Sequence, residues 1–245
     1  MRSSDFINRK LLKEYPLRRG GRSDPSEPSK KRAKASRARG KRNGSESSKD
    51  ILLAAARVEF AARGLEGARI DSIAERSGMN KQLVYHYFGS KDDLYQAVLE
   101  DAYTTFVAPF AHLDSAVRPA SRRLKEFIEF LFDRIDQDPQ FQALITDENV
   151  HSGRHVKRSS AVKKILTPVV ESLIEIFNQA KQDGSLDCDI DPIDLYLDIA
   201  GMCAFYFTNI HTLSAALSRN LRAAQSVEQR KEHVVSFVLS ALRPK

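Results

Sequence analysis

The sequence of 245 residues has no tryptophan and only two cysteines, Cys188 and Cys203. These two cysteines lack the spacing of metal ligands or of a disulfide framework, which favours a reducing cytoplasm. Long hydrophobic runs are missing as well, because the longest, Ile199–Phe207, falls short of the ~18–20 residues that span a bilayer. The first twenty residues are charged and hold no continuous apolar segment of a secretory signal. These absences predict a cytoplasmic protein that does not contact a membrane.

The motifs of common enzymes are also missing. We find no glycine-rich phosphate loop, no nucleophile elbow, no HExxH and no paired-carboxylate motif. An enzyme is therefore the weaker alternative, and we expect neither a cofactor nor a bound metal.

Positive charge is concentrated in one segment. The chain carries a formal net charge of +7, but residues 1–46 alone hold 15 Lys/Arg against 5 Asp/Glu. From Arg18 to Ser47 there is no large hydrophobic residue, so nothing offsets the entropy of ordering the backbone. We therefore predict that 1–46 is a disordered basic extension. Two alternatives remain for this extension. It touches DNA phosphates non-specifically, or it is a solvated tail without a function, as it would be if the start codon were placed too far upstream.

Helical periodicity dominates the rest of the chain, and no stretch of comparable length alternates with the period of a strand. The predicted fold class is all-α, with a helix-turn-helix domain of three short helices over 47–107. A helical effector-binding and dimerisation domain follows over 108–245. Glycines, caps and apolar spacing predict a first helix from Ser47 to Gly64 and further helices over 70–77, 81–87, 91–107, 120–136, 139–150, 159–182, 191–217 and 227–242.

Three short helices, a turn centred on Gly78 and a further helix that begins at Lys91 are the parts of a helix-turn-helix. The stretch Gly67–Leu94, GARIDSIAERSGMNKQLVYHYFGSKDDL, closely resembles the DNA-binding domain of the TetR family of transcriptional regulators. The similarity includes the Tyr-x-Tyr-Phe spacing that starts at Tyr85 and the Ser-Lys-x-x-Leu spacing that starts at Ser90. It covers about residues 47–107, and beyond them only length and helical layout agree.

An α-helix fits the major groove, so the helix that begins near Lys81 is the predicted recognition helix. Lys81 and Gln82 can reach base edges, and Leu83 can pack on a thymine methyl group. Lys91 stands where free backbone N–H groups favour a phosphate. The resemblance implies DNA contacts from Asn80, Lys81, Gln82, Leu83, Tyr85, His86, Tyr87 and Lys91.

Arg69 departs from the family pattern, in which Thr or Ser commonly stands at the entry to the second helix. The capping hydroxyl is lost there, and a longer cationic contact to phosphate takes its place. We therefore add Arg69 to the predicted DNA-binding residues.

The resemblance implies that the C-terminal helices bind an effector and form a homodimer. The apolar helix from Asp191 and the last helix have more apolar surface than a peripheral helix needs, although a larger monomer core would explain this too. A small organic effector suits an apolar pocket with a few polar groups, for which the candidates are Tyr103, Phe106, Phe130, Arg134, Phe141, Asn149, His151, His155, Phe177, Tyr206 and Asn209.

Two alternatives remain for the polar run at 147–151. It is either a set of hydrogen-bonding groups in the pocket or a solvated loop between helices, and a metal site from Glu148, His151 and His155 is the weakest reading. The predicted function is that of a sequence-specific regulator, a repressor released from a palindromic operator by a small molecule. A DNA-binding protein without an effector is the alternative that shares the same headpiece.

Overall fold

Helices form every regular element in the part of the chain that the computed structural model describes, which comprises residues 32–112, 118–186 and 190–243. Side chains are described within 48–110, 118–186 and 190–243. This confirms the all-α fold class. In the described residues the elements are α2 (Arg32–Gly67), α3 (Ile70–Ser77), α4 (Lys81–Phe88), α5 (Lys91–Val107), the 3-10 helix η1 (Ala108–His112), α6 (Ala120–Gln137), α7 (Pro139–Val150), α8 (Arg154–Arg158), α9 (Ser160–Asp183), α10 (Pro192–Thr208), α11 (Ile210–Ala216) and α12 (Ala224–Ala241).

The structure describes only part of the basic extension. Residues 32–46 are helical and form the first part of α2, while residues 1–31 lie outside the described residues. Alanine, arginine and lysine have high intrinsic helix propensity, so a segment without a hydrophobic face can still continue a helix towards its N-terminus. The predicted start of the first helix at Ser47 is therefore too late.

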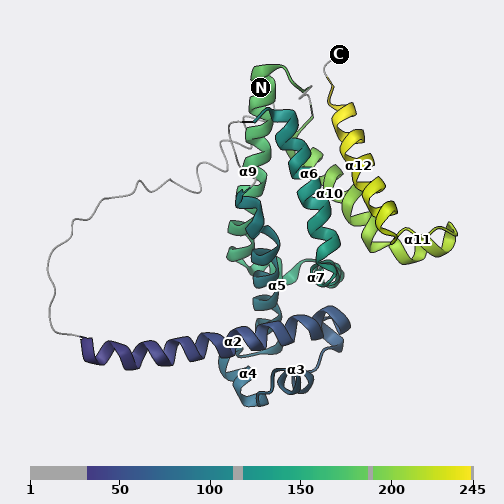
Figure 1. The fold of residues 1–245 in the computed structure, drawn as a ribbon. Coiled ribbons are helices and arrows are strands. Elements are labelled where there is room, and N and C mark those ends of the chain that lie inside the picture. Colours follow the sequence, from purple (N-terminus) through teal and green to yellow (C-terminus); the bar gives the residue numbers. More distant parts are fainter. Residues whose placement is uncertain (1–31, 113–117, 187–189, 244–245) are drawn as a thin grey trace. The chain divides into compact units, whose positions relative to one another are not determined.

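The helices of residues 47–245 enclose one continuous apolar core. α3 and α4 pack on each other, and α4 packs on α5, which runs on to contact α9. α6 packs against α9, α10 and α12 (Figure 1). The largest side chains of the core include Phe60, Tyr95, Phe127, Phe132 and Phe177. α5 thus belongs to the predicted DNA-binding part and is also held by the C-terminal helices.

The predicted helix over 191–217 is divided in two. Asn209 ends α10 with φ −107° and ψ 6°, and its side-chain amide donates to the Phe205 carbonyl at 2.9 Å. Asparagine side chains compete with the backbone for hydrogen bonds in this way. The helix is therefore interrupted at Asn209, although the apolar pattern of the sequence continues through it. A second difference is α8, which forms between the predicted helices over 139–150 and 159–182.

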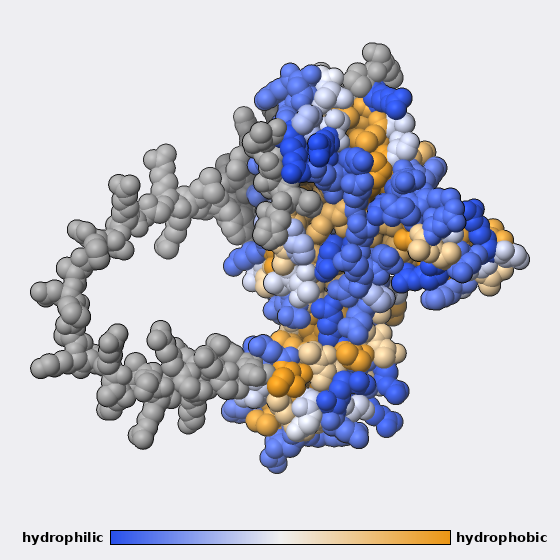
Figure 2. All heavy atoms as spheres, in the orientation of Figure 1, coloured by the Kyte–Doolittle hydropathy of each residue, from blue (hydrophilic) through white to orange (hydrophobic). Residues whose placement is uncertain are grey.

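None of the helices in the described ranges is long and apolar enough to cross a bilayer. The face in Figure 2 is largely hydrophilic, with hydrophobic residues in separate patches.

Candidate nucleic-acid interface

The turn between α3 and α4 orients the predicted recognition helix. Gly78 takes a left-handed φ of 69°, and the Met79 N–H donates to the Ala74 carbonyl at 2.9 Å, which closes the end of α3. On the inner side Ile73, Ala74 and Val84 are buried. The crossing of the two helices is therefore fixed by their small apolar interface, and the opposite side of α4 faces away from it.

Asn80 caps α4. Its side-chain oxygen accepts the Leu83 N–H at 2.9 Å, so one otherwise unpaired donor of the first turn is satisfied. This use of the side chain makes Asn80 a structural residue of the recognition helix as well as a candidate contact.

The outer face of α4 collects most of the predicted DNA contacts. Lys81, Gln82, Tyr85 and His86 are exposed, while Leu83 and Tyr87 are half-buried. The His86 and Tyr87 rings meet edge to face with centroids 5.4 Å apart. Since only Val84 of this helix is buried, seven of its eight side chains remain at least partly accessible. The position of α4 is therefore fixed mainly by its contacts with α3 and α5, and most of its polar side chains are accessible to a DNA duplex.

Lys81 has a partner that sequence reasoning missed. Its Nζ lies 2.9 Å from Oδ1 of Asp71 on α3, and both side chains are well exposed. The hydrogen bond and charge of Asp71 raise the pKa of Lys81 above its ordinary value, so the ammonium stays protonated at physiological pH. DNA binding would require Lys81 to exchange this carboxylate for a base edge or a phosphate.

Lys91 is also engaged within the chain. Its Nζ donates to the Glu66 carbonyl at 3.1 Å, at the C-terminal end of α2 where carbonyls lack helical partners. Ser90 caps α5 by accepting the Asp93 N–H at 3.1 Å. Asp92 in the same first turn pairs with Arg154 of α8 at 2.6 Å. The predicted phosphate anchor is thus a half-buried lysine surrounded by acidic neighbours.

At the entry to α3 no side-chain hydroxyl caps the helix. Arg69 makes no side-chain cap, but its backbone N–H donates to Oε1 of the buried Glu59 at 3.3 Å. Arg63 lies 3.3 Å from the same carboxylate oxygen. The Arg69 side chain is exposed and remains a candidate for phosphate. Nothing in the local sequence pointed to Glu59, which precedes Arg69 by ten residues.

Four of the predicted effector-binding residues meet in one cluster. Phe141 of α7 stacks on Phe106 at 4.1 Å between centroids and meets Tyr103 edge to face at 5.3 Å. Arg134 lies over the Phe106 ring at 5.5 Å and donates to the carbonyls of Thr105 and Phe106, which end α5. Burial raises the pKa of Tyr103 to about 12, so its phenol is neutral. We call Tyr103, Phe106, Arg134 and Phe141 the aromatic cluster.

The other candidates lie elsewhere. Phe130 packs near Phe110, Phe177 is buried in the core, and Tyr206 lies against Phe132 and donates to the Leu221 carbonyl. Asn149 and Asn209 donate to carbonyls within their own helices, and the His151 ring contacts the Asp147 carbonyl. The sequence could not show which candidates lie together, because contacts between helices that are distant in sequence depend on the tertiary packing.

His155 is enclosed in a polar contact between helices. It is fully buried, its Nδ1 lies 2.8 Å from Glu148 Oε2, and its Nε2 lies 3.3 Å from Asp92 Oδ1. The Glu148 carboxylate also accepts the backbone N–H groups of His155 and Val156. No group of three potential metal ligands occurs in the chain as far as the structure describes it.

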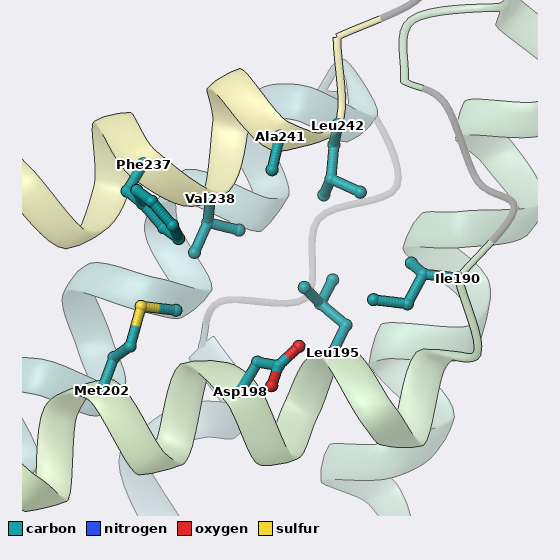
Figure 3. A pocket seen from close by; sticks show the side chains of 8 residues that line it. All are labelled: Ile190, Leu195, Asp198, Met202, Phe237, Val238, Ala241 and Leu242. Carbon is teal, nitrogen blue, oxygen red and sulfur yellow. The ribbon is translucent and has the colours of Figure 1, made fainter.

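A cavity of about 610 Å³ lies between α10 and α12 (Figure 3). Seven of its eight lining residues are apolar, Asp198 is the exception, and none of them is among the predicted effector-binding candidates. Large hydrophobic residues are exposed on both helices, and one of them, Phe237, also lines the cavity. They are Ile193, Leu197, Phe205 and Phe237. We call these four residues the apolar face.

Comparisons with known proteins match both the N-terminal and the C-terminal helices of the chain. Residues 52–98 match the family described as bacterial regulatory proteins, tetR family, and residues 121–238 match a tetracyclin repressor-like C-terminal domain. The chain is 31% identical over 195 residues to the HTH-type transcriptional repressor NicS of Pseudomonas putida, an alignment that covers 80% of this chain and 92% of the relative.

Two further proteins show similarity over the same extent. The HTH-type transcriptional regulator RutR of Escherichia coli is 27% identical over 197 residues, with 80% of this chain and 91% of the relative covered. The crystal structure of a transcriptional regulator, SCO4942, from Streptomyces coelicolor superposes with a TM-score of 0.62 at 27% identity. That superposition covers 80% of this chain and 99% of the other.

Proposed function

The chain belongs to the TetR family of bacterial regulatory proteins, and from this premise we propose that it represses transcription from a palindromic operator. It does so as a homodimer that a small organic effector releases from the DNA. The observation that carries the proposal is the exposed polar face of α4, held outward by the buried Ile73, Ala74 and Val84.

On this proposal α4 enters the major groove with its N-terminal end. Lys81 donates to guanine, Gln82 pairs with adenine through its amide, and Leu83 contacts a thymine methyl group. Phosphates are contacted by Arg69, Asn80 and Lys91 and, further along α4, by Tyr85, His86 and Tyr87.

Dimerisation is proposed through the apolar face of α10 and α12. Ile193, Leu197 and Phe205 recur along α10 at spacings of four and eight residues, and Phe237 of α12 is exposed as well. Exposed large hydrophobic groups in such a row favour burial against a partner surface. In an isologous dimer each copy contributes the same surface, so α10 and α12 of one copy pack against α10 and α12 of the other. Two headpieces then read two half-sites of one palindrome.

The effector site is proposed at the aromatic cluster. Its rings supply apolar contact area, while the Tyr103 phenol and the Arg134 guanidinium supply donors of the kind that orient a small molecule. The division into a DNA-binding part over 47–107 and an effector-binding and dimerisation part over 108–245 belongs to the same proposal. Since the partner is operator DNA, the protein would act in the cytoplasm.

Selection from random duplex DNA tests the DNA-binding proposal. The full-length chain should enrich a palindrome with two half-sites, and Gln82→Ala should relax the base preference at one position of each half-site by about 10- to 100-fold. Lys163→Ala, an exposed change on α9, serves as the control and should select the same palindrome. Enrichment of no sequence by the wild-type chain would refute the proposal.

The effector proposal has a separate test. A small molecule that binds the folded state should raise the melting temperature and reduce operator binding at the same concentration. Replacement of Tyr103 by Phe should weaken both responses. Compounds that release the wild-type protein and the variant from DNA equally would remove the aromatic cluster from the proposed site.

A further inference from the structure

Helix α7 is tied to α2 at two points. Near its start, Oδ2 of Asp138 accepts a hydrogen bond from Arg57 at 2.6 Å, and both side chains are largely buried. Nine residues later, Oδ2 of Asp147 accepts the backbone N–H of Leu65 at 2.8 Å. The two anchors on α2 are eight residues apart, which is slightly more than two helical turns. α7 therefore fixes the direction of the end of α2 rather than one point on it.

Asp147 meets α2 at the place where its helix is broken. Gly64 adopts φ 66° and ψ 176°, a conformation that favours glycine. A Cβ on Gly64 would lie 2.4 Å from Asp147 Oδ1, so a larger residue would displace the carboxylate. Leu65 is buried, and a buried N–H requires a partner. The carboxylate of Asp147 therefore completes the last turn of α2, which leads directly into α3.

A second helix of the headpiece is bound to the same carboxylate. The Tyr95 hydroxyl of α5 donates to Asp147 Oδ2 at 2.9 Å, and its ring is fully buried against Phe60. Burial and the bond to Asp147 both raise the pKa of Tyr95, so the phenol keeps its proton and donates. One side chain of α7 thus joins the end of α2 to α5, the two helices on either side of α3 and α4.

The remaining contacts of α7 are with α5, α6 and α8. The other oxygen of Asp138 caps α7 through the Phe141 N–H at 3.0 Å, and the Phe141 ring belongs to the aromatic cluster. Glu148, which follows Asp147, is bonded to the buried His155. A shift of α7 at the aromatic cluster would therefore move the acceptor of Leu65 and Tyr95.

We propose that Asp147 is a positioning residue, which through Leu65 and Tyr95 sets the direction of the DNA-binding helices and hence the half-site spacing that the dimer accepts. The inference rests on the proposed function. It assigns Asp147 no contact with DNA, because its carboxylate is turned towards Leu65 and Tyr95 and would repel phosphate.

The test compares operators of different spacing. The full-length protein is measured against the selected palindrome and against versions with one or two base pairs inserted or deleted at the centre. Asp147→Asn should lower affinity for the selected palindrome about tenfold, since charge-assisted bonds to two donors are weakened. Affinity for the altered spacings should fall much less, so that discrimination between spacings narrows while base preferences within each half-site stay unchanged.

Two further variants complete the design. Tyr95→Phe removes only the hydroxyl and should narrow the discrimination in the same direction by about threefold. If Asp147→Asn does not fold, the discrimination of Tyr95→Phe between operator spacings tests the inference by itself. Glu171→Gln, an exposed carboxylate change on α9, is the matched control and should behave as the wild type.

Equal loss of affinity at every spacing would show that Asp147 only stabilises the fold and would overturn the inference. Unchanged affinity and unchanged discrimination in both variants would overturn it too. A wild-type chain that selects no palindrome would instead contradict the proposed function itself.

Discussion

Within the described part of the chain, helices α4 and α10 each expose one side, but the chemistry of the two sides is opposite. α4 exposes Lys81, Gln82, Tyr85 and His86, all of which can donate hydrogen bonds. α10 exposes Ile193, Leu197 and Phe205, none of which can. The first surface suits the edges and phosphates of a duplex, and the second suits another apolar surface. An exposed helix face therefore indicates the kind of partner it binds by the chemical groups on it.

The largest effect is expected from a charge on the apolar side. Phe205→Glu should place an unpaired carboxylate in the proposed dimer interface, at a cost of about 3–5 kcal/mol. Light scattering should then give the mass of one chain, and operator affinity should fall at least a hundredfold. Gln182→Glu adds the same charge at an exposed position of α9, outside the proposed interface, and should leave the mass unchanged. Equal masses for the wild type and Phe205→Glu would show that α10 is not the interface.

The inner side of the helix-turn-helix should respond through stability. Ile73 is fully buried between α3 and its neighbours, so Ile73→Ala should lower the free energy of unfolding by about 2–5 kcal/mol. Gln82→Ala on the outer side should change it by no more than about 0.5 kcal/mol. Denaturant titration measures both, and similar losses in the two variants would contradict the assignment of an inner and an outer side.

The flank of the interface should show a smaller effect on DNA alone. Lys91→Ala should reduce affinity for all sequences about tenfold and lower the slope of log affinity against log salt by about one. Its cost in stability should be slight, because its bond to the Glu66 carbonyl lies at the surface. Lys164→Ala on α9 provides the control. A salt slope equal to that of the wild type would exclude Lys91 as a phosphate anchor.

The smallest effect is expected at the ion pair beside α4. Asp71→Asn removes the carboxylate that competes with DNA for Lys81, so operator affinity should rise by about two- to fivefold. The melting temperature should stay close to that of the wild type, since both partners are well exposed. Weaker binding would indicate that Asp71 orients Lys81 for its base contact instead of restraining it.

Local signals made most of the headpiece predictable from sequence. Asn80 and Ser90 cap their helices, and Gly78 ends α3, because each acts within about four residues. The all-α class followed from periodicity in the same way. The break at Asn209 was missed, since the apolar pattern continues through it and the interruption depends on one side-chain bond.

Long-range partners could not be predicted. Glu59 reaches Arg69 across ten residues, and Asp147 reaches Leu65 across 82, so neither contact leaves a local pattern. For the same reason the sequence could not predict that Phe106 and Phe141 stack on each other, or that Phe177 is outside that contact. Which face of a long helix meets which neighbour is decided by packing.

The most direct test of the account is the affinity of the full-length protein for its selected palindrome and for an unrelated duplex at one salt concentration. Reading of base edges by α4 predicts that the palindrome binds at least about a thousandfold more tightly. Equal affinities would mean that only phosphates are contacted, and the central claim for α4 would be wrong.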